Sequence, residues 1–186
     1  MRAGAATALA GCTLAGAAAL AAGPAHPDAY GTYRLAGRAR VEARPFPAQE
    51  QEVHADAVLS AGAGPGAVRL RLAGEGLACD LSGTLAPDGA LELAPGQRCA
   101  TDLRSEEVEG RVEARLLSGS GRVRDDAMTL ELDFALSGAV KVRSGGALDA
   151  LTSLLPPPGA GPEPVPVRGQ ARGRAEGRRD HSRAAG

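Results

Sequence analysis

The sequence predicts an all-β protein, an antiparallel meander that forms a curved sheet or a small barrel or sandwich, with one short C-terminal helix. Three observations support this prediction. Apolar and charged residues alternate along several segments, the connections between these segments are short and rich in turn residues, and the body holds one even pair of cysteines. Alternation with period two places one set of side chains on one face of a strand. Short reversals make consecutive strands antiparallel, and a sheet with one dry face must close on itself or be covered.

Two segments show the strongest alternation. Over 107–116, Val, Gly, Ala and Leu alternate with Glu and Arg, and over 128–143 Met, Leu, Phe and Val alternate mostly with polar residues. Read as helices, both segments would scatter charge around the whole circumference. The Pro, Asp and Gly of 86–89 predict a tight reversal. Weaker alternation predicts further strands at 33–42, 53–59, 68–72, 77–81 and 91–93.

The chain of 186 residues suits one domain, and the strand pattern places an antiparallel β domain at 30–143. Its aromatic residues are few: Tyr30, Tyr33, Phe46 and Phe134. The core must therefore consist mainly of Val, Leu and Ala, which bury less area per residue than aromatic rings do. We expect a thin core that needs another source of stability.

Residues 1–25 read as a signal peptide, because a minimal positive start is followed by a long, weakly apolar run and small residues suited to cleavage. "LAGC", ending at Cys12, also fits a bacterial lipobox, although the apolar run continues after the cysteine. A third alternative is a retained anchor, since about 20 apolar residues span a bilayer. The first alternative makes the body periplasmic or secreted. The second makes it a membrane-anchored lipoprotein through Cys12. All three place the body outside the cytoplasm.

Cys79 and Cys99 are the cysteines that remain without Cys12, and in an exported protein an even pair predicts a disulfide. Closing a loop of about 20 residues stabilises a protein by roughly 3 kcal/mol in the chain-entropy model. This bridge would supply the support that the thin core requires. With no histidine nearby, the two cysteines make a poor zinc site.

The C-terminal part, 144–186, changes in composition. Leu148, Leu151 and Leu155 have helical spacing, so we expect a short helix at about 146–155 that could plug one end of the sheet. A Pro/Gly linker and an Arg-rich tail follow. Alternation returns over 167–176, but its inner face would consist mostly of Gly and Ala. This tail is either a final edge strand or disordered.

Catalytic chemistry has few candidates. His54 is the body's one histidine, and Glu52 and Asp56 would share its strand face. Residues i and i+2 of a strand stand about 6.5–7 Å apart, so these three cannot surround one ion without a second strand. We therefore predict that the protein is not an enzyme and that it holds no cofactor or metal.

Charge excludes strong attraction to nucleic acid. From His26 to Leu155 there are 14 basic and 19 acidic residues, and from Pro156 onwards six basic and three acidic ones. The basic tail has no aromatic residue on which bases could stack. We expect no nucleic-acid partner, and membrane contact only through an N-terminal lipid anchor.

The sequence thus predicts a non-catalytic structural or interaction domain of the bacterial envelope, with an unknown partner. The alternative is a carrier that binds a lipid or another apolar small molecule on the concave face of the sheet, because inner residues rich in Ala, Gly and Val leave room for a ligand. The opening "GTYRL" (31–35) resembles the G-x-W opening of lipocalin-like barrels, with Tyr33 in place of the tryptophan. This resemblance implies a closed antiparallel barrel that holds a small apolar ligand.

Overall fold

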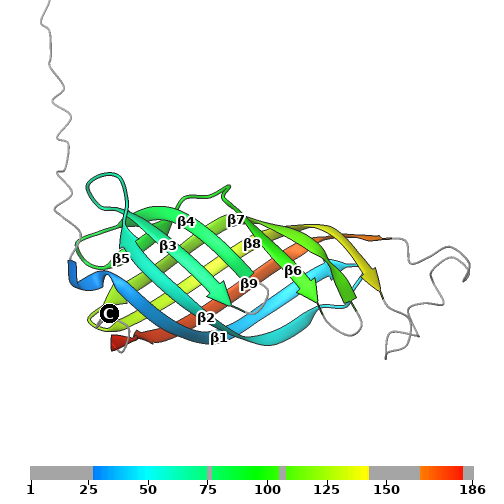
Figure 1. Cartoon of the computed structure of the whole chain (residues 1–186), viewed down its shortest axis with the longest axis horizontal. Helices are drawn as coiled ribbons and strands as arrows, with labels where there is room; N and C mark the ends of the chain where they lie inside the picture. Colours follow the sequence, from blue (N-terminus) through cyan, green and yellow to red (C-terminus); the bar gives the residue numbers. More distant parts are fainter. Residues whose placement is uncertain (1–26, 75–76, 105–107, 143–163, 182–186) are drawn as a thin grey trace, which may run out of the picture.

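Except at one interruption, consecutive strands pair with one another along the chain, and the last strand pairs with the first, so the sheet closes into an irregular ring (Figure 1). The computed structural model describes residues 27–74, 77–104, 108–142 and 164–181. In these residues a 3-10 turn, η1 (Pro27–Ala29), precedes nine antiparallel strands. Their bounds are β1 (Gly31–Arg44), β2 (Gln49–Ala61), β3 (Ala67–Gly74), β4 (Leu77–Leu85), β5 (Ala90–Leu93), β6 (Arg98–Arg104), β7 (Val108–Arg124), β8 (Ala127–Val142) and β9 (Val165–Arg179).

The predicted all-β antiparallel fold is confirmed, as a ring rather than a sandwich. The alternating residues of the sequence form the strands, and their apolar members face inward. In β7, for example, Val112, Ala114 and Leu116 are buried while the residues between them are exposed. A β-bulge between Leu116 and Ser118 then shifts the inward phase by one residue. Beyond this bulge Gly119 and Gly121 take the inner positions.

The final strand corrects the sequence-based boundary at 143. We expected the Arg-rich segment to be an edge strand or disordered, but β9 pairs with β1 on one side and β8 on the other. The physical reason is that a meander ending at β8 leaves unpaired backbone N–H and C=O groups at the edges of β1 and β8. One further strand between them forms hydrogen bonds with both edges. The helix expected at about 146–155, the signal peptide at 1–25 and the lipobox cysteine Cys12 lie outside the described residues.

Two features make the ring irregular. β5 and β6 share one place between β4 and β7, separated by a short interruption. Gln97 lies in this interruption, and its side chain accepts hydrogen bonds from the Ser82 amide and hydroxyl and donates to the carbonyls of Ser82 and Ala94. In addition, β3 pairs with β2 only from Ala55 to Ala61. Within the described residues, positions 49–54 of β2 therefore pair with β1 alone.

Two apolar clusters lie inside the ring. The larger cluster is built mainly of leucines from seven strands and includes Tyr33, whose side chain is fully buried. The smaller cluster surrounds Val112, Val140 and Val167 near the start of β9. No polar or charged residue in the described part of the chain is buried in these clusters. The core thus consists largely of aliphatic side chains, as the composition predicts.

One end of the ring is closed by polar contacts to Tyr33. Its hydroxyl donates to the carbonyl oxygen of Ala29 in η1 at 2.6 Å and accepts from Nη2 of Arg179 at 3.1 Å. The guanidinium of Arg179 also lies over the Tyr33 ring, 5.6 Å from its centroid. Because Arg179 is the last residue of β9, this contact ties the end of the sheet to its beginning.

Candidate functional site

Arginines on β1 and β9 face one another in direct register along the outer surface of the ring. The two strands run antiparallel, and four arginines of β1 each have an arginine of β9 as cross-strand partner. All eight side chains are exposed. The pairs, called the arginine ladder here, are Arg34/Arg178, Arg38/Arg174, Arg40/Arg172 and Arg44/Arg168.

Like charges directly opposite one another in a sheet are destabilising. Acidic residues on the neighbouring strands offset part of this repulsion. On β2, Glu50 and Glu52 lie opposite Arg40 and Arg38. On β8, Glu131 and Asp133 lie opposite Arg174 and Arg172. The middle of the ladder therefore has the cross-strand order acid, arginine, arginine, acid.

Half of the ladder takes part in ion pairs. The nitrogen–oxygen distances are 2.7 Å for Arg34–Asp180, 2.7 Å for Arg40–Glu42, 3.8 Å for Arg40–Glu50, 2.9 Å for Arg172–Asp133 and 3.5 Å for Arg174–Glu131. The hydrogen bond to Asp133, and then the charge of that carboxylate, raise the pKa of Arg172. Asp180 and Asp133 are largely buried, whereas both partners are exposed in the pairs of Arg40 and Arg174. Exposed pairs contribute little to folding, about 0–1 kcal/mol each, so Arg40 and Arg174 remain open to exchange for other anions.

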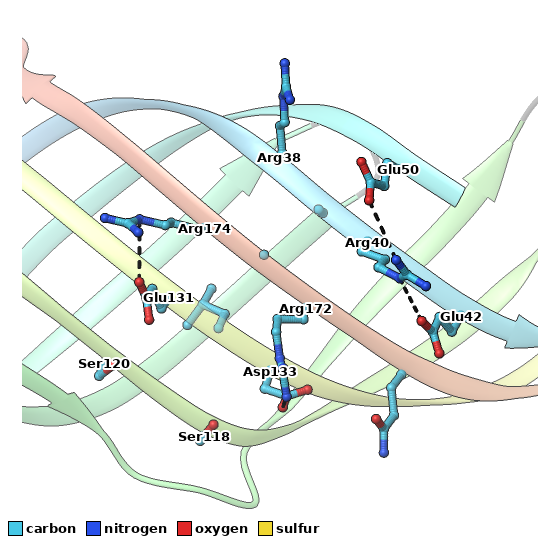
Figure 2. A pocket seen from close by; sticks show the side chains of 14 residues that line it. Arg38, Arg40, Glu42, Glu50, Ser118, Ser120, Glu131, Asp133, Arg172 and Arg174 are labelled. Atoms are coloured by element: carbon cyan, nitrogen blue, oxygen red, sulfur yellow. Dashed lines mark hydrogen bonds and ion pairs between the residues drawn. The ribbon is translucent and has the colours of Figure 1, made fainter. Parts of the chain in front are cut away.

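The other half of the ladder has no ion pair within the described part of the chain. These arginines are Arg38, Arg44, Arg168 and Arg178. Figure 2 shows Arg38 pointing away from the labelled carboxylates, while dashed lines join Arg40 and Arg174 to carboxylates. Arg172 pairs with Asp133. The pair Arg44/Arg168 consists entirely of such arginines.

The centre of the ladder lines a hollow of about 770 Å³ on the outer surface. Its walls carry four ladder arginines from β1 and β9, acids from β1, β2 and β8, and neutral hydrogen-bonding groups (Figure 2). The neutral groups are Ser118, Ser120 and Gln170. Guanidinium groups bind carboxylates and phosphates through paired N–H donors, so this arrangement suits an anion that also bears hydroxyl groups.

The predicted disulfide between Cys79 and Cys99 is confirmed. Cys79 of β4 and Cys99 of β6 both face the interior, with 4.8 Å between their Cα atoms. Among the described residues, β4 and β6 share two cross-strand pairs, Leu77 with Thr101 and Ala78 with Ala100. The bridge joins the two strands directly beside these pairs.

The catalytic candidates are not brought together into a site. Glu52 and His54 are exposed on the outer surface of β2, and Asp56 follows two residues further along the same strand. Among the described residues, no group of three His, Cys, Asp or Glu side chains is placed to hold a metal ion. Nor do these residues include a helix long and apolar enough to cross a membrane.

The inner face, on which the carrier hypothesis depends, is occupied along most of its length by the two apolar clusters. Two hollows of the described residues involve outward-facing charged side chains: the one at the centre of the ladder, and another over β6, β7 and β8. Binding of an apolar ligand stays a prediction. Sequence reasoning missed the arginine ladder, which requires knowledge of the strand register.

No protein family, curated protein or solved structure matches this chain. The fold and the ladder therefore define only a class, a disulfide-bonded antiparallel β domain with an arginine-rich outer face.

Proposed function

We propose that this chain is a non-catalytic interaction domain of the bacterial envelope and that it binds an anionic partner through the arginine ladder. The observation that carries this proposal is the direct register of four arginine pairs. Such pairs repel each other in the free protein, and an anion placed between two guanidinium groups converts that repulsion into attraction. The acids beside the ladder limit the repulsion until a partner binds.

The disulfide indicates a non-reducing compartment, and periplasmic or secreted location is our proposal within that limit. We expect the intact mass of the protein from its native host to begin within residues 22–26. This mass should rise by that of two hydrogens on reduction, because the bridge opens. A mass that begins at Cys12 and carries lipid would instead identify a lipoprotein. A mass that begins at Met1 would contradict cleavage.

The variant Arg44→Glu tests the role of the ladder without harming the fold. Glutamate at this position lies opposite Arg168, and the only other strand partner of Arg168 is the neutral Ser137. A cross-strand pair of opposite charges contributes about 0.2–1 kcal/mol, so the free energy of unfolding should rise slightly. Binding to a phosphate-bearing resin at low salt should become about two- to tenfold weaker, as expected for lost exposed ion contacts.

Arg69→Glu is the matched control for this experiment. It makes the same change of charge on β3, where the cross-strand neighbours are the neutral Ser60 and Ser82. We expect this control to keep its retention on the resin and to gain no stability. Equal weakening by the two substitutions would show that net charge, and not the ladder, governs binding. Absence of retention of the unmodified protein would refute the proposed function.

A further inference from the structure

The width of the ladder restricts what kind of anion it can hold. The arginines occupy two adjacent strands, which also carry Glu176 and Glu42 between the arginine pairs, and further acidic residues lie on the strand at either side. Neighbouring strands are about 4.8 Å apart, so the two acidic rows on β2 and β8 are separated by about 14 Å. A broad anionic surface laid across the ladder would meet both acidic rows and be repelled by them. The cationic strip therefore suits a single narrow chain better than a membrane or a nucleic-acid duplex.

The length of the ladder points to a polymer rather than a small anion. From Arg34 to Arg44 the strand rises by about 33 Å, and the arginine pairs recur along it at intervals of about 13, 7 and 13 Å. One small anion can contact one of these pairs or two at most. A linear chain with repeated negative charges can contact all four pairs.

The neutral hydrogen-bonding groups that line the hollow further restrict the class of anion that it can bind. Gln170 offers hydrogen bonds on β9 itself, and the carboxylate of Glu131 on β8 accepts hydrogen bonds from hydroxyl groups, whereas Ser118 and Ser120 lie on β7, beyond the acids of β8. A chain rich in both carboxylates and hydroxyls can use the arginines, Gln170 and the flanking acids. The lining of the hollow includes no aromatic side chain, so it lacks the stacking surface on which single-stranded nucleic acid depends.

We propose that the arginine ladder holds one extended chain of an acidic polysaccharide, with its carboxylates between the paired arginines and its hydroxyls on Gln170 and the flanking acids. This inference rests on the proposed function, because it names the partner class of the same site. The sugar chain lies along the β1–β9 seam, and both acidic rows confine it there.

The experiment measures binding of the disulfide-bonded protein to oligogalacturonates of increasing length by isothermal titration calorimetry at low salt. The affinity is expected to rise with chain length until the oligomer spans about 33 Å and then to level off. The double variant Arg38→Ala/Arg174→Ala should bind the longest oligomer about tenfold more weakly. The matched control Arg69→Ala/Arg71→Ala removes the same charge from β3 and should bind like the unmodified protein.

The same binding measurement is made with anionic phospholipid vesicles and with neutral dextran. Binding to oligogalacturonate that is independent of length, or that both double variants weaken equally, would overturn the placement of the chain along the ladder. Binding to vesicles or phosphate resin without binding to oligogalacturonate would overturn the polysaccharide but leave an anionic partner. Failure to bind any anionic probe would overturn the proposed function as well. Unchanged thermal unfolding of each variant shows that a loss of binding is not a loss of fold.

Discussion

The variant Cys79→Ala/Cys99→Ala is expected to lose roughly 3 kcal/mol of its free energy of unfolding, because it lacks a bridge that closes a loop of about 20 residues. The structure adds a local reason for a loss of this size. In the described part of the chain, two cross-strand pairs hold β6 to β4, and the bridge lies beside them. In a core that consists mostly of aliphatic side chains, no large aromatic residue compensates at this position.

Urea denaturation followed by far-UV circular dichroism measures this effect. The midpoint should fall in the double variant and in the reduced unmodified protein by similar amounts, since both lack the same covalent link. The reduced protein retains both sulfur atoms, so it separates the loss of the bridge from the small voids that alanine leaves. If the reduced and oxidised proteins unfold at the same urea concentration, the bridge is not a source of stability.

The fold could be predicted from the sequence where alternating side chains differ strongly in polarity. In β8, Met128, Leu130 and Phe134 are buried and Glu131 is exposed, so the inner face is visible without a structure. The bulge after Leu116 was not predicted, because one extra residue in a strand reverses the phase but leaves the local alternation intact. Its position is set by pairing with β8 and by the interruption between β5 and β6.

The last strand shows a second limit. β9 presents mainly Gly and Ala inward, so its burial of apolar surface is too small to distinguish a strand from a disordered tail. β9 is held as a strand by pairing with two sheet edges, on β1 and β8, and these edges exist only after the other strands have paired. That property belongs to the whole sheet and not to any local segment.

The arginine ladder combines a local pattern with a non-local condition. In each strand the four ladder arginines follow one another at intervals of four, two and four positions, and this spacing is the same in either direction. Two such sets coincide completely when antiparallel strands pair in the right register, and the structure has that register. The symmetric spacing is visible in the sequence, but nothing in the sequence alone identifies 168–178 as the partner of 34–44.

We expect Gly177→Ala to destabilise the protein by about 1–3 kcal/mol or more, as for other substitutions that overfill a packed site. A Cβ atom at Gly177 would overlap the carbonyl oxygen of Arg34 on β1 and come within 2.9 Å of the Leu35 Cα atom. Because these are backbone atoms, the clash can be relieved only by moving β9 away from β1. The variant should also bind anions less well, since Arg174 and Arg178 lie on the displaced strand.

Gly173→Ala is the matched control for this prediction, because Gly173 is on the same inner face of β9, four residues earlier. The nearest atom to its Cβ would be Ala39 Cβ at 3.6 Å, which is an ordinary contact. Alanine at a compatible glycine position stabilises a protein by about 0.4–1 kcal/mol, since it restricts the unfolded chain. The midpoints of thermal and urea denaturation should therefore fall for Gly177→Ala and rise for Gly173→Ala. Equal effects would mean that β9 does not close the ring by close approach to β1, and the register of the arginine ladder would lose its structural basis.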